Sequence, residues 1–373
     1  KPKTATVYTY EPVLEKYDNN IYKSVGSTKV KRAAKGIDTE KYLNRCIDSI
    51  IQAIKLVKDK VEIIIINDGS KGNADEIIES YVKNFPDTIV YIKQENKGRG
   101  ATRNVGISKA RGKYISFIDS DDYIDDNMYL DMLSKLKSED ADIAICDFQN
   151  IIENNPENSG RIEAKNLNIE DNKFGCFDVL ILPSCCNKII SKELFNNVKF
   201  PEHINYEDLA IIPSIVLEAK KIVYLPNMYY KYYQNTDSVM NKAYDIDRLN
   251  LIDALEISLD RIDNLNLSKE DKEKAEYMLC TRRFYEEFLE KIMFSSKKKE
   301  LVKGFCDRIQ NIEKRLINNK YFIKEISTQG VLKKIGNKLL HKAIRSKDYN
   351  KLNMYLKTKI YYRFFAIRYT NVI

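Results

Sequence analysis

Residues 114–122 read Tyr-Ile-Ser-Phe-Ile-Asp-Ser-Asp-Asp, a mostly apolar run that ends in a cluster of carboxylic acids. A short run of this kind is typical of a buried strand, here Tyr114–Ile118, followed by an acidic turn. Residues 61–66 form a second apolar run, broken by Glu62, and it ends in Asn-Asp-Gly-Ser at residues 67–70. Both runs therefore predict strands that place carboxylates where they end.

Helical and strand-like segments alternate around these two runs. The predicted helices cover residues 40–58, 74–84, 100–111 and 126–137, and the predicted strands cover residues 61–66, 88–93, 114–118 and 143–146. Alternation of this kind indicates an α/β fold with a Rossmann-like, mostly parallel, doubly wound sheet. Such sheets bind ligands beyond the carboxyl ends of their strands, which is where both acidic turns fall.

The second half of the chain is less regular. Residues 150–172 are polar and rich in Asn, which indicates an excursion or a linker, and residues 173–235 return to mixed structure. From residue 245 onward the pattern is helical, and four apolar residues share one helix face, namely Ile252, Leu255, Leu259 and Ile262. The chain of 373 residues is long enough for two domains, or for one domain with an appendage.

Charge is distributed unevenly along the chain. The whole sequence has a net charge of +8, but residues 330–373 carry eleven Lys or Arg and only one acid, Asp348. Because basic and apolar residues are interleaved there, this basic tail suits an anionic membrane surface. A helical bundle packed on the rest of the protein is an equal alternative. Nucleic acid is not expected as a partner, because no nucleic-acid motif is present.

Composition disfavours several kinds of site. Two histidines, His203 and His341, leave little material for a histidine-centred triad or a histidine-rich metal site. Neither an apolar run of membrane-spanning length nor a signal-peptide pattern is present, so we expect a cytoplasmic protein. The seven cysteines lack Cys-x-x-Cys spacing, and the adjacent pair Cys185-Cys186 suits neither a metal site nor a disulfide, so we expect reduced thiols.

The turn Asp119-Ser120-Asp121 has a chemical interpretation. Two carboxylates two residues apart can present oxygens to one hard cation, which can bridge the phosphates of a nucleotide and neutralise a leaving diphosphate. A simpler alternative is that residues 119–122 complement the dipole of the helix that follows. A calcium loop is also an alternative, although the Gly and Glu of EF-hand spacing are missing.

A third segment gives these turns a family resemblance. Residues 96–106 read Asn-Lys-Gly-Arg-Gly-Ala-Thr-Arg-Asn-Val-Gly. Together with the turns at 67–70 and 119–122, they closely resemble the family 2 glycosyltransferases of GT-A fold. Those proteins show an Asp-Asp-Gly-Ser turn, an Asn-x-Gly…Ala-Arg-Asn-x-Gly helix and a Phe-x-Asp-x-Asp-Asp strand end. Order and spacing match over residues 40–147. The near-neutral body and the basic helical tail resemble the bacterial capsular and exopolysaccharide enzymes of this family.

The resemblance continues more loosely to residue 240. Relatives carry an Asn-Lys pair before a Phe-ending helix, a Tyr-Glu-Asp turn and a Tyr-rich strand. The matching positions here are Asn187-Lys188 with Phe195, Tyr206-Glu207-Asp208, and residues 229–232.

The resemblance implies a division of the chain into three regions. They are an atypical N-terminal segment at residues 1–39, a GT-A domain at residues 40–240, and a helical, basic region at residues 245–373. Within the GT-A domain, residues 40–147 correspond to the nucleotide-binding half and residues 173–240 to the acceptor half.

The activity implied is an inverting transfer of a sugar from a UDP-sugar to a glycan or lipid-linked acceptor in the synthesis of a surface polysaccharide. The implied cofactor is Mn²⁺ or Mg²⁺, and the implied location is the cytoplasm or the inner face of the cell membrane. The donor-binding residues implied are Asp68, Gly69, Asn96, Arg103, Asp119 and Asp121. In this scheme Asp68 accepts a hydrogen bond from uracil, and Arg103 contacts the nucleotide or its diphosphate. Asp119 and Asp121 position the nucleotide and the metal, with Asp121 the preferred direct ligand.

On the acceptor side, the resemblance implies that Asp208 is the general base that deprotonates the acceptor hydroxyl. An inverting transfer needs one base there and charge stabilisation on the leaving side, so the scarcity of histidine is no obstacle. Simpler structural roles stay open: Asp68 as a helix cap, Arg103 as part of an ion pair, Asn187-Lys188 as a structural pair, and Asp208 as a cap. In the last case Glu207 becomes the more important acid.

The first strand departs from the family. Relatives carry an apolar run ending in Pro-x-Tyr-Asn shortly before the first helix, whereas residues 29–36 here read Lys-Val-Lys-Arg-Ala-Ala-Lys-Gly. Either Thr4–Tyr10 supplies this strand, with a long insertion after it, or the donor site is built incompletely. The altered strand supports a rival function, a degenerate and non-catalytic scaffold. A sugar nucleotidyltransferase is a weaker rival, because its Gly-rich loop after the first strand is absent.

Overall fold

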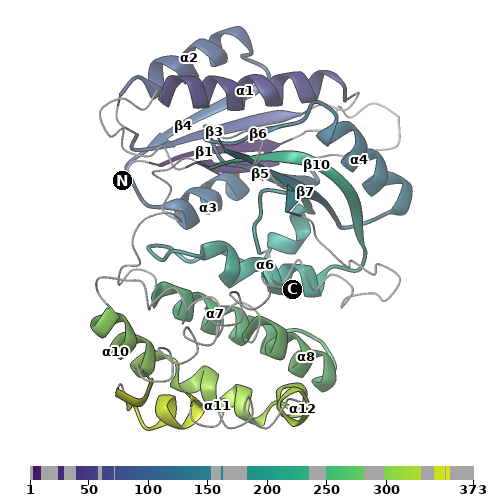
Figure 1. Cartoon of the computed structure of the whole chain (residues 1–373). Coiled ribbons are helices and arrows are strands. Elements are labelled where there is room, and N and C mark those ends of the chain that lie inside the picture. Colours follow the sequence, from purple (N-terminus) through teal and green to yellow (C-terminus); the bar gives the residue numbers. More distant parts are fainter. Residues whose placement is uncertain are drawn as a thin grey trace, which may run out of the picture. The chain divides into compact units, whose positions relative to one another are not determined.

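The structure is a computed structural model, and it describes eleven segments of the chain. They are residues 3–9, 24–28, 39–57, 61–70, 72–152, 161–162, 183–234, 249–280, 298–328, 340–348 and 350–352. The chain divides into two compact units, Lys1–Asn241 and Lys242–Ile373, called here the N-terminal unit and the C-terminal unit (Figure 1).

One sheet forms the centre of the N-terminal unit (Figure 1). Its strands are β1 (Lys3–Thr9), β2 (Ser24–Thr28), β3 (Glu62–Asp68), β4 (Ile89–Gln94), β5 (Tyr114–Ile118), β6 (Tyr123–Ile124), β7 (Ile143–Ile152), β8 (Arg161–Ile162), β9 (Lys188–Ser191) and β10 (Ile222–Gln234). The order across the sheet is β4-β3-β1-β5-β9-β7-β10-β6, with β2 beside β1 and β8 beside β7.

The sheet is mixed, which corrects the expectation of a mostly parallel one. Strands β3 and β4 pair in parallel, as do β7 and β10, but β1, β9 and β6 run antiparallel to their neighbours. The prediction rested on the alternation over residues 40–147, whereas β1 and β9 enter from outside that range and need no helical crossover. Strands β4, β3, β5, β7 and β10 nevertheless share one direction, because β1 and β9 each oppose both of their neighbours. The carboxyl ends of β3 and β5 therefore still lie at the same edge of the sheet.

Residues 3–9 supply a central strand, which agrees with one of the two alternatives proposed from the sequence. Strand β1 lies between β3 and β5, with Lys3 opposite Asp68 and Thr9 opposite Glu62. Because β1 runs antiparallel to β3, its amino end lies at the edge of the acidic turns. The structure thus fills the place of the first strand, but with a strand of opposite direction.

Helices cover both faces of this sheet (Figure 1). They are α1 (Thr39–Lys55), α2 (Ala74–Asn84), α3 (Arg99–Lys109), α4 (Met128–Glu139) and α6 (Glu207–Glu218), with a short 3-10 helix at Lys192–Phe195. Helices α1 and α2 lie on one face, and α3 and α6 lie on the other. Helix α1 packs on the sheet through an apolar stripe whose members are all buried, namely Leu43, Ile47, Ile50 and Ile51. The four helices and four strands predicted between residues 40 and 147 all exist, and the ends of α2 and β5 coincide with the prediction.

Glu62, the one charged residue in the apolar run of β3, is buried because it has a cationic partner. The backbone N–H of Arg111 donates to its Oε1 at 2.9 Å, and Arg111 Nε donates to its Oε2 at 2.9 Å. The pair joins the start of β3 to the loop before β5. A buried carboxylate with several donors is tolerated in a core, whereas an isolated one is not.

The C-terminal unit is helical in its described part. Its helices are α7 (Asn250–Asn264), α8 (Lys269–Cys280), α10 (Lys298–Arg308), α11 (Gln310–Asn318) and α12 (Lys320–Thr328). The predicted face of Ile252, Leu255, Leu259 and Ile262 is buried. Arg315 joins three helices, since its guanidinium binds Asp263 at 2.9 Å and Glu276 at 2.8 Å.

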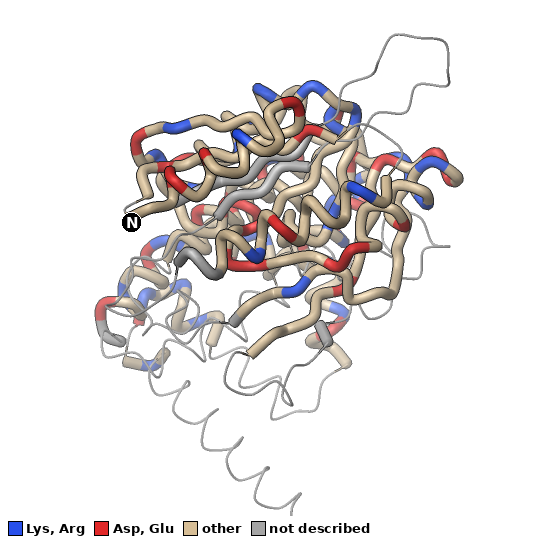
Figure 2. Tube along the Cα trace, turned by 90° about the horizontal axis from the view of Figure 1, so that it is seen from above, with Lys and Arg blue, Asp and Glu red and all other residues tan. Residues whose placement is uncertain are grey.

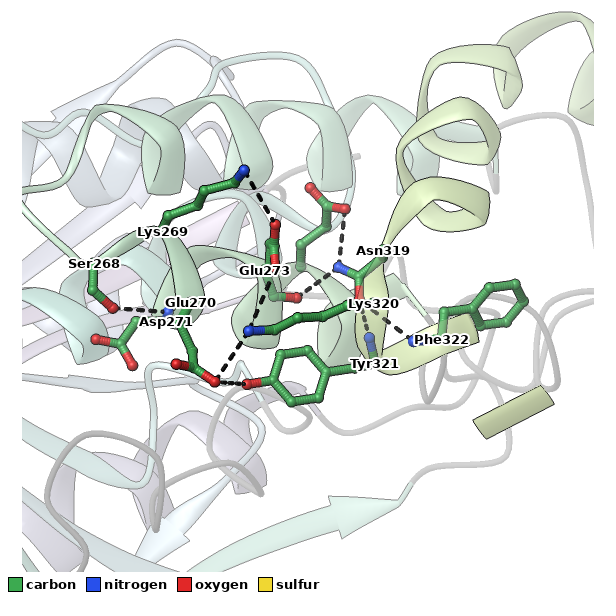
Figure 3. Close-up of polar contacts among 10 residues, drawn as sticks. Ser268, Lys269, Glu270, Asp271, Glu273, Asn319, Lys320, Tyr321 and Phe322 are labelled. Atoms are coloured by element: carbon green, nitrogen blue, oxygen red, sulfur yellow. Dashed lines mark hydrogen bonds and ion pairs between the residues drawn. The ribbon is translucent and has the colours of Figure 1, made fainter. Parts of the chain in front are cut away.

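A second polar contact joins α8 to the start of α12 (Figure 3). Asn319 Nδ2 donates to the carbonyl of Glu273 at 2.7 Å, while Lys320 Nζ and Tyr321 Oη approach Glu270 Oε1 at 3.1 and 2.9 Å. These contacts cross between helices that are far apart in sequence, so they fix how the helices of this unit pack.

Two predictions concern the chain as a whole. Six cysteines are described, and all six are buried free thiols, as expected; Cys176 lies outside the described residues. No described helix combines the length and the apolar character needed to cross a bilayer. Most of the basic tail lies outside the described residues, and its described part carries Lys342, Arg345, Lys347 and Lys351 but only one acid, Asp348. Figure 2 shows basic and acidic residues interspersed over the described chain as a whole.

Candidate active site

The acidic turn after β5 is held from one side by helix α1. Arg45 Nη2 donates to the carbonyl of Asp121 at 3.0 Å, and the thiol of Cys46 donates to the carbonyl of Asp119 at 3.6 Å. One turn later, Ser49 Oγ accepts the backbone N–H of Ile124 at 3.2 Å. Three residues on one face of α1 thus fix the backbone of the turn.

Strand β10 holds the same turn through the side chain of Asp122. Its Oδ2 accepts the hydroxyl of Tyr230 at 2.6 Å, and its Oδ1 accepts the backbone N–H of Tyr233 at 2.8 Å. Burial, and next the charges of Asp121 and Asp119, raise the pKa of Asp122 well above its ordinary value. The third carboxylate of the motif is therefore a structural anchor, a role that the sequence did not reveal.

Asp119 is the carboxylate of this turn that has an oxygen without a hydrogen-bond donor among the described residues. Its side chain is 24% exposed, and its Oδ1 lies 3.7 Å from Arg103 Nη2. That oxygen is buried and has no hydrogen-bond donor among the described residues. Burial raises the pKa of Asp119 to about 7, with Arg103 opposing the shift and Asp121 adding to it. A buried carboxylate oxygen without a hydrogen-bond donor is costly, and binding a cation or a proton removes this cost.

The donor set fits a cation that shares its ligands with a substrate. Asp119 and Asp121 offer carboxylate oxygens, which Mn²⁺ and Mg²⁺ prefer. Among the described residues no group of three His, Cys, Asp or Glu side chains could hold an ion without help. A cation bound to this turn must therefore complete its coordination with water and with oxygens of a ligand.

Asp68, at the end of β3, anchors the loop that leads into α3. Its Oδ1 accepts Gln94 Nε2 and the backbone N–H of Lys97, both at 2.8 Å, and its Oδ2 accepts the backbone N–H of Gly98 at 3.0 Å. Asn96 Nδ2 donates to the carbonyl of Asp68 at 2.9 Å. Asp68 thus ties the tip of β3 to Gly98, the residue before α3. Three donors leave this carboxylate one of its roughly four acceptor positions.

The backbone conformation and the close packing at position 69 require glycine. Its φ is +74°, a left-handed conformation that glycine adopts without strain. A Cβ atom there would also lie 3.0 Å from the backbone nitrogen of Asn96. The predicted donor residues Asp68, Gly69 and Asn96 are therefore in direct contact with one another.

A buried ion network joins α3 to α6. Arg103 Nη1 donates to Glu207 Oε1 at 2.5 Å, and Arg99 Nη2 lies 3.0 Å from Glu207 Oε2. The guanidinium of Arg103 also packs against the rings of Phe117 and Phe200, at 5.8 and 5.4 Å from their centroids. The Nε atoms of Arg99 and Arg103 are buried without a hydrogen-bond acceptor among the described residues. The network places unsatisfied cationic donors beside Asp119.

Asp208 follows Glu207 in the first turn of α6. It is half-buried, and the backbone N–H of Leu209 donates to its Oδ1 at 2.9 Å. Burial raises its pKa, the charge of Glu207 raises it further, and Arg103 and Arg99 oppose the shift. Tyr206, just before α6, has a φ of +67°, a strained conformation for a residue with a side chain. This sharp turn brings both acids onto the start of the helix.

The Asn187-Lys188 pair is buried next to β7. Asn187 Nδ2 donates to the carbonyl of Cys146 at 2.6 Å, and Lys188 Nζ donates to Asn187 Oδ1 at 2.8 Å and to the carbonyl of Ser184 at 2.5 Å. Burial lowers the pKa of Lys188 to about 8. These contacts agree with the structural alternative for this pair.

The structure gathers most of the predicted residues into two connected groups. Asp119, Arg103, Glu207 and Asp208 lie around the ion network, and Asp68, Gly69 and Asn96 lie at the entry of α3. Sequence reasoning missed Arg99, although an Arg at the first position of a helix that starts after a glycine is a usable signal. It also missed Arg45, which is one of several charged residues of α1 and has no distinguishing signal in the sequence.

Comparison with known proteins agrees with this geometry. The sequence profile described as Glycosyl transferase family 2 matches residues 37–199. Glycosyltransferase GlyG of Streptococcus pneumoniae serotype 4 is 31% identical over 271 residues, which cover 65% of this chain and 88% of GlyG. The minor teichoic acid biosynthesis protein GgaB of Bacillus subtilis is 29% identical over 218 residues, 55% of this chain but only 23% of GgaB.

Among solved structures, S. aureus TarS 1–349 shares the fold, with a TM-score of 0.67 at 18% identity over 86% of this chain and 88% of that one. A complex of the same TarS fragment with UDP-GlcNAc has a TM-score of 0.64 at 19% identity, again over 86% and 88% of the two chains. The fold, the acidic turn at the carboxyl edge of the sheet and the similarity to GlyG together lead to one conclusion. This chain belongs to the family 2 glycosyltransferases.

Proposed function

We propose that this protein transfers a sugar, with inversion, from a UDP-sugar to a glycan or lipid-linked acceptor during the synthesis of a surface polysaccharide. The observation that carries the proposal is the buried Oδ1 of Asp119, which has no hydrogen-bond donor among the described residues and lies 3.7 Å from a buried guanidinium. The turn that bears it is held by both α1 and β10. A rigid turn with an unsatisfied carboxylate is a suitable place for a metal–diphosphate group.

On the donor side, Asp119 and Asp121 would hold Mn²⁺ or Mg²⁺. When bound, the cation supplies positive charge to the oxygens of the leaving diphosphate. Arg99 and Arg103 add fixed positive charge beside Asp119, and their buried Nε–H groups are available to an acceptor. Asp68 keeps the loop before α3 in place, and its remaining acceptor position is assigned to the ring N–H of uracil.

On the acceptor side, Asp208 is assigned the role of general base. The acceptor oxygen attacks the anomeric carbon from the face opposite the diphosphate, its proton passes to Asp208, and the bond to the diphosphate breaks. The raised pKa of Asp208 supports this role, because it brings the carboxylate closer to the pH at which the protein works. Glu207 is engaged by Arg99 and Arg103, so we assign it to positioning rather than to proton transfer.

The polymer class is inferred from the relatives. GgaB is named for minor teichoic acid biosynthesis, and the similarity to it suggests an anionic or lipid-linked glycan as acceptor. The basic tail is proposed to bind an anionic membrane surface on the cytoplasmic side, where such acceptors are anchored.

Calorimetric titration of UDP in the presence and absence of Mn²⁺ tests the donor site. We expect binding that strengthens with Mn²⁺, and Asp121→Ala is expected to abolish the Mn²⁺ effect. Asp126→Ala is the matched control, because Asp126 is an exposed acid five residues further along the chain. UDP-GlcNAc is the first sugar nucleotide to test, because TarS, which shares this fold, has been solved in complex with it. No binding of UDP with Mn²⁺, or unchanged binding in Asp121→Ala, would contradict the proposal and favour a non-catalytic scaffold.

A further inference from the structure

Arg45 on α1 lies in a box of three tyrosine rings. The centre of its guanidinium is 5.3 Å from the ring centroid of Tyr42, 4.5 Å from that of Tyr123 and 4.4 Å from that of Tyr233. The three tyrosines come from three different elements, α1, β6 and β10. The rings of Tyr42 and Tyr233 also touch, with centroids 4.9 Å apart. Aromatic faces attract a cation, so the box fixes the plane and the position of the guanidinium.

Among the described residues, this guanidinium donates its hydrogen bond to the acidic turn. Its Nη2 donates to the carbonyl of Asp121 at 3.0 Å. Its Nε is buried and has no hydrogen-bond acceptor among the described residues. A buried cationic donor without an acceptor costs free energy, and such a cost is usually retained where a ligand or a mechanism requires it.

The guanidinium suits this place better than an ammonium group. It is planar and can stack on rings while its edge still donates hydrogen bonds in fixed directions, whereas lysine is a flexible point charge. The next residue, Cys46, donates to the carbonyl of Asp119, so neighbouring residues of α1 hold both ends of the Asp-x-Asp turn. Arg45 provides the stronger and more directional of the two contacts, because its donor is charged.

We propose that Arg45 is a positioning residue of the donor site, which holds the backbone of Asp121 so that this carboxylate presents its oxygens to the metal–diphosphate group. The inference rests on the proposed function of the Asp-x-Asp turn. It assigns to Arg45 no contact with the sugar nucleotide.

Two substitutions separate positioning from folding. Arg45→Lys keeps the charge but loses the planar fork, and Tyr123→Leu keeps Arg45 but removes one face of the box. The dissociation constant of UDP is measured with and without Mn²⁺, together with the melting temperature of the protein without ligand. Arg308→Lys is the control, since this arginine forms an exposed ion pair with Asp253 in the C-terminal unit.

We expect Arg45→Lys to weaken UDP binding about tenfold in the presence of Mn²⁺, the effect of one charge-assisted hydrogen bond. Binding without Mn²⁺ and the melting temperature should stay close to those of the wild type. Tyr123→Leu should act in the same direction with a smaller factor, and Arg308→Lys should change neither constant.

Three results would overturn the inference. If Arg45→Lys weakens UDP equally with and without Mn²⁺, Arg45 contacts the nucleotide or supports the fold as a whole. If UDP binding is unchanged under both conditions, Arg45 has no part in the site. If the wild type itself shows no Mn²⁺-dependent binding of UDP, the proposed function fails and the inference fails with it.

Discussion

Arg103 Nη1 lies 2.5 Å from Glu207 Oε1, and both side chains are almost fully buried. The two residues are separated by 104 positions in the sequence, and the contact joins helix α3 to the start of helix α6. Because Asp208 follows Glu207 directly, the same contact also fixes the proposed base relative to the acidic turn. The pair is therefore the link between the two halves of the candidate site.

Breaking this pair from one side should destabilise the N-terminal unit. Glu207→Ala leaves the guanidinium of Arg103 buried without its main counter-charge, and the loss of unfolding free energy is expected to be about 3–5 kcal/mol. Chemical denaturation followed by circular dichroism measures the change. The double substitution Arg103→Met with Glu207→Met should recover a large part of the loss, because no uncompensated charge remains.

The control is an exposed ion pair of the same unit. Glu139 binds Lys135 at 3.1 Å and Lys221 at 2.8 Å on the surface. Glu139→Ala should cost less than about 1 kcal/mol, as surface ion pairs generally do. Equal losses of unfolding free energy for Glu207→Ala and Glu139→Ala would show that the buried pair stabilises the unit no more than a surface pair does.

The sequence predicted this site in part, and the limits have physical causes. The strand ends at Asp68 and Asp119 were predictable because apolar runs followed by turn residues depend on local chemistry alone. The partnership of Arg103 with Glu207 was not predictable, since it depends on how two distant helices pack. Sequence reasoning weighed Arg103 as a ligand contact and as an ion pair, and only the fold supplies the partner.

The direction of the first strand is a second limit. The sequence offers Thr4–Tyr10 as one candidate for the missing first strand, but the side-chain pattern of a strand carries no information about its direction. Strand β1 runs antiparallel to β3 and β5, so the sheet is mixed. The anchoring role of Asp122 was not predictable either, because its partners Tyr230 and Tyr233 lie more than a hundred residues away on β10.

Gly100 provides a test of how closely α3 must approach its neighbours. A Cβ atom at this position would lie 2.0 Å from the carbonyl oxygen of Pro201, which is backbone and cannot rotate away. Gly100→Ala should therefore destabilise the protein by about 2 kcal/mol or more, despite the better helix propensity of alanine. Because Gly100 follows Arg99 directly, UDP binding should weaken as well. Thermal unfolding and calorimetry measure the two effects.

Gly304 in α10 is the matched control. A Cβ atom there would lie 2.4 Å from Cδ1 of Leu249, the far end of a flexible side chain. Since Leu249 can change rotamer, Gly304→Ala should alter stability by no more than about 1 kcal/mol. If Gly100→Ala proves as harmless as Gly304→Ala, α3 does not pack on Pro201 as described.

Asp68→Asn should affect both the stability of the loop before α3 and the preference of the donor site for uracil over cytosine. In the variant, an NH2 group replaces one oxygen of Asp68 and cannot accept an N–H donor, whereas backbone N–H groups now bind both oxygens, so about 1–3 kcal/mol of stability should be lost. If the remaining hydrogen-bond acceptor position of residue 68 binds the ring N–H of uracil, the preference for UDP over CDP should fall in the variant. Titration of both nucleotides with Mn²⁺ measures this preference. An equal loss of affinity for UDP and CDP would limit Asp68 to its anchoring role.

The pH dependence of transfer tests the role of Asp208. A general base acts in its deprotonated form, so kcat/KM should rise with pH through the pKa of Asp208 and level off above it. Burial and the charge of Glu207 raise this pKa, so the acidic limb should lie at a higher pH than the value of about 4 of an ordinary aspartate. Asp208→Asn should lower kcat by about 10²–10⁴ and leave Mn²⁺-dependent UDP binding unchanged.

Two further variants test whether the acidic limb of the kcat/KM profile belongs to Asp208. Glu207→Gln removes the negative charge that raises the pKa of Asp208 and leaves Arg99 and Arg103 to lower it, so the acidic limb should move to lower pH. His203 lies five positions before Asp208 in the sequence, so it is the residue chosen for the control substitution. His203→Gln should leave the limb in place. A limb that follows His203, or that persists in Asp208→Asn, would show that another group accepts the proton.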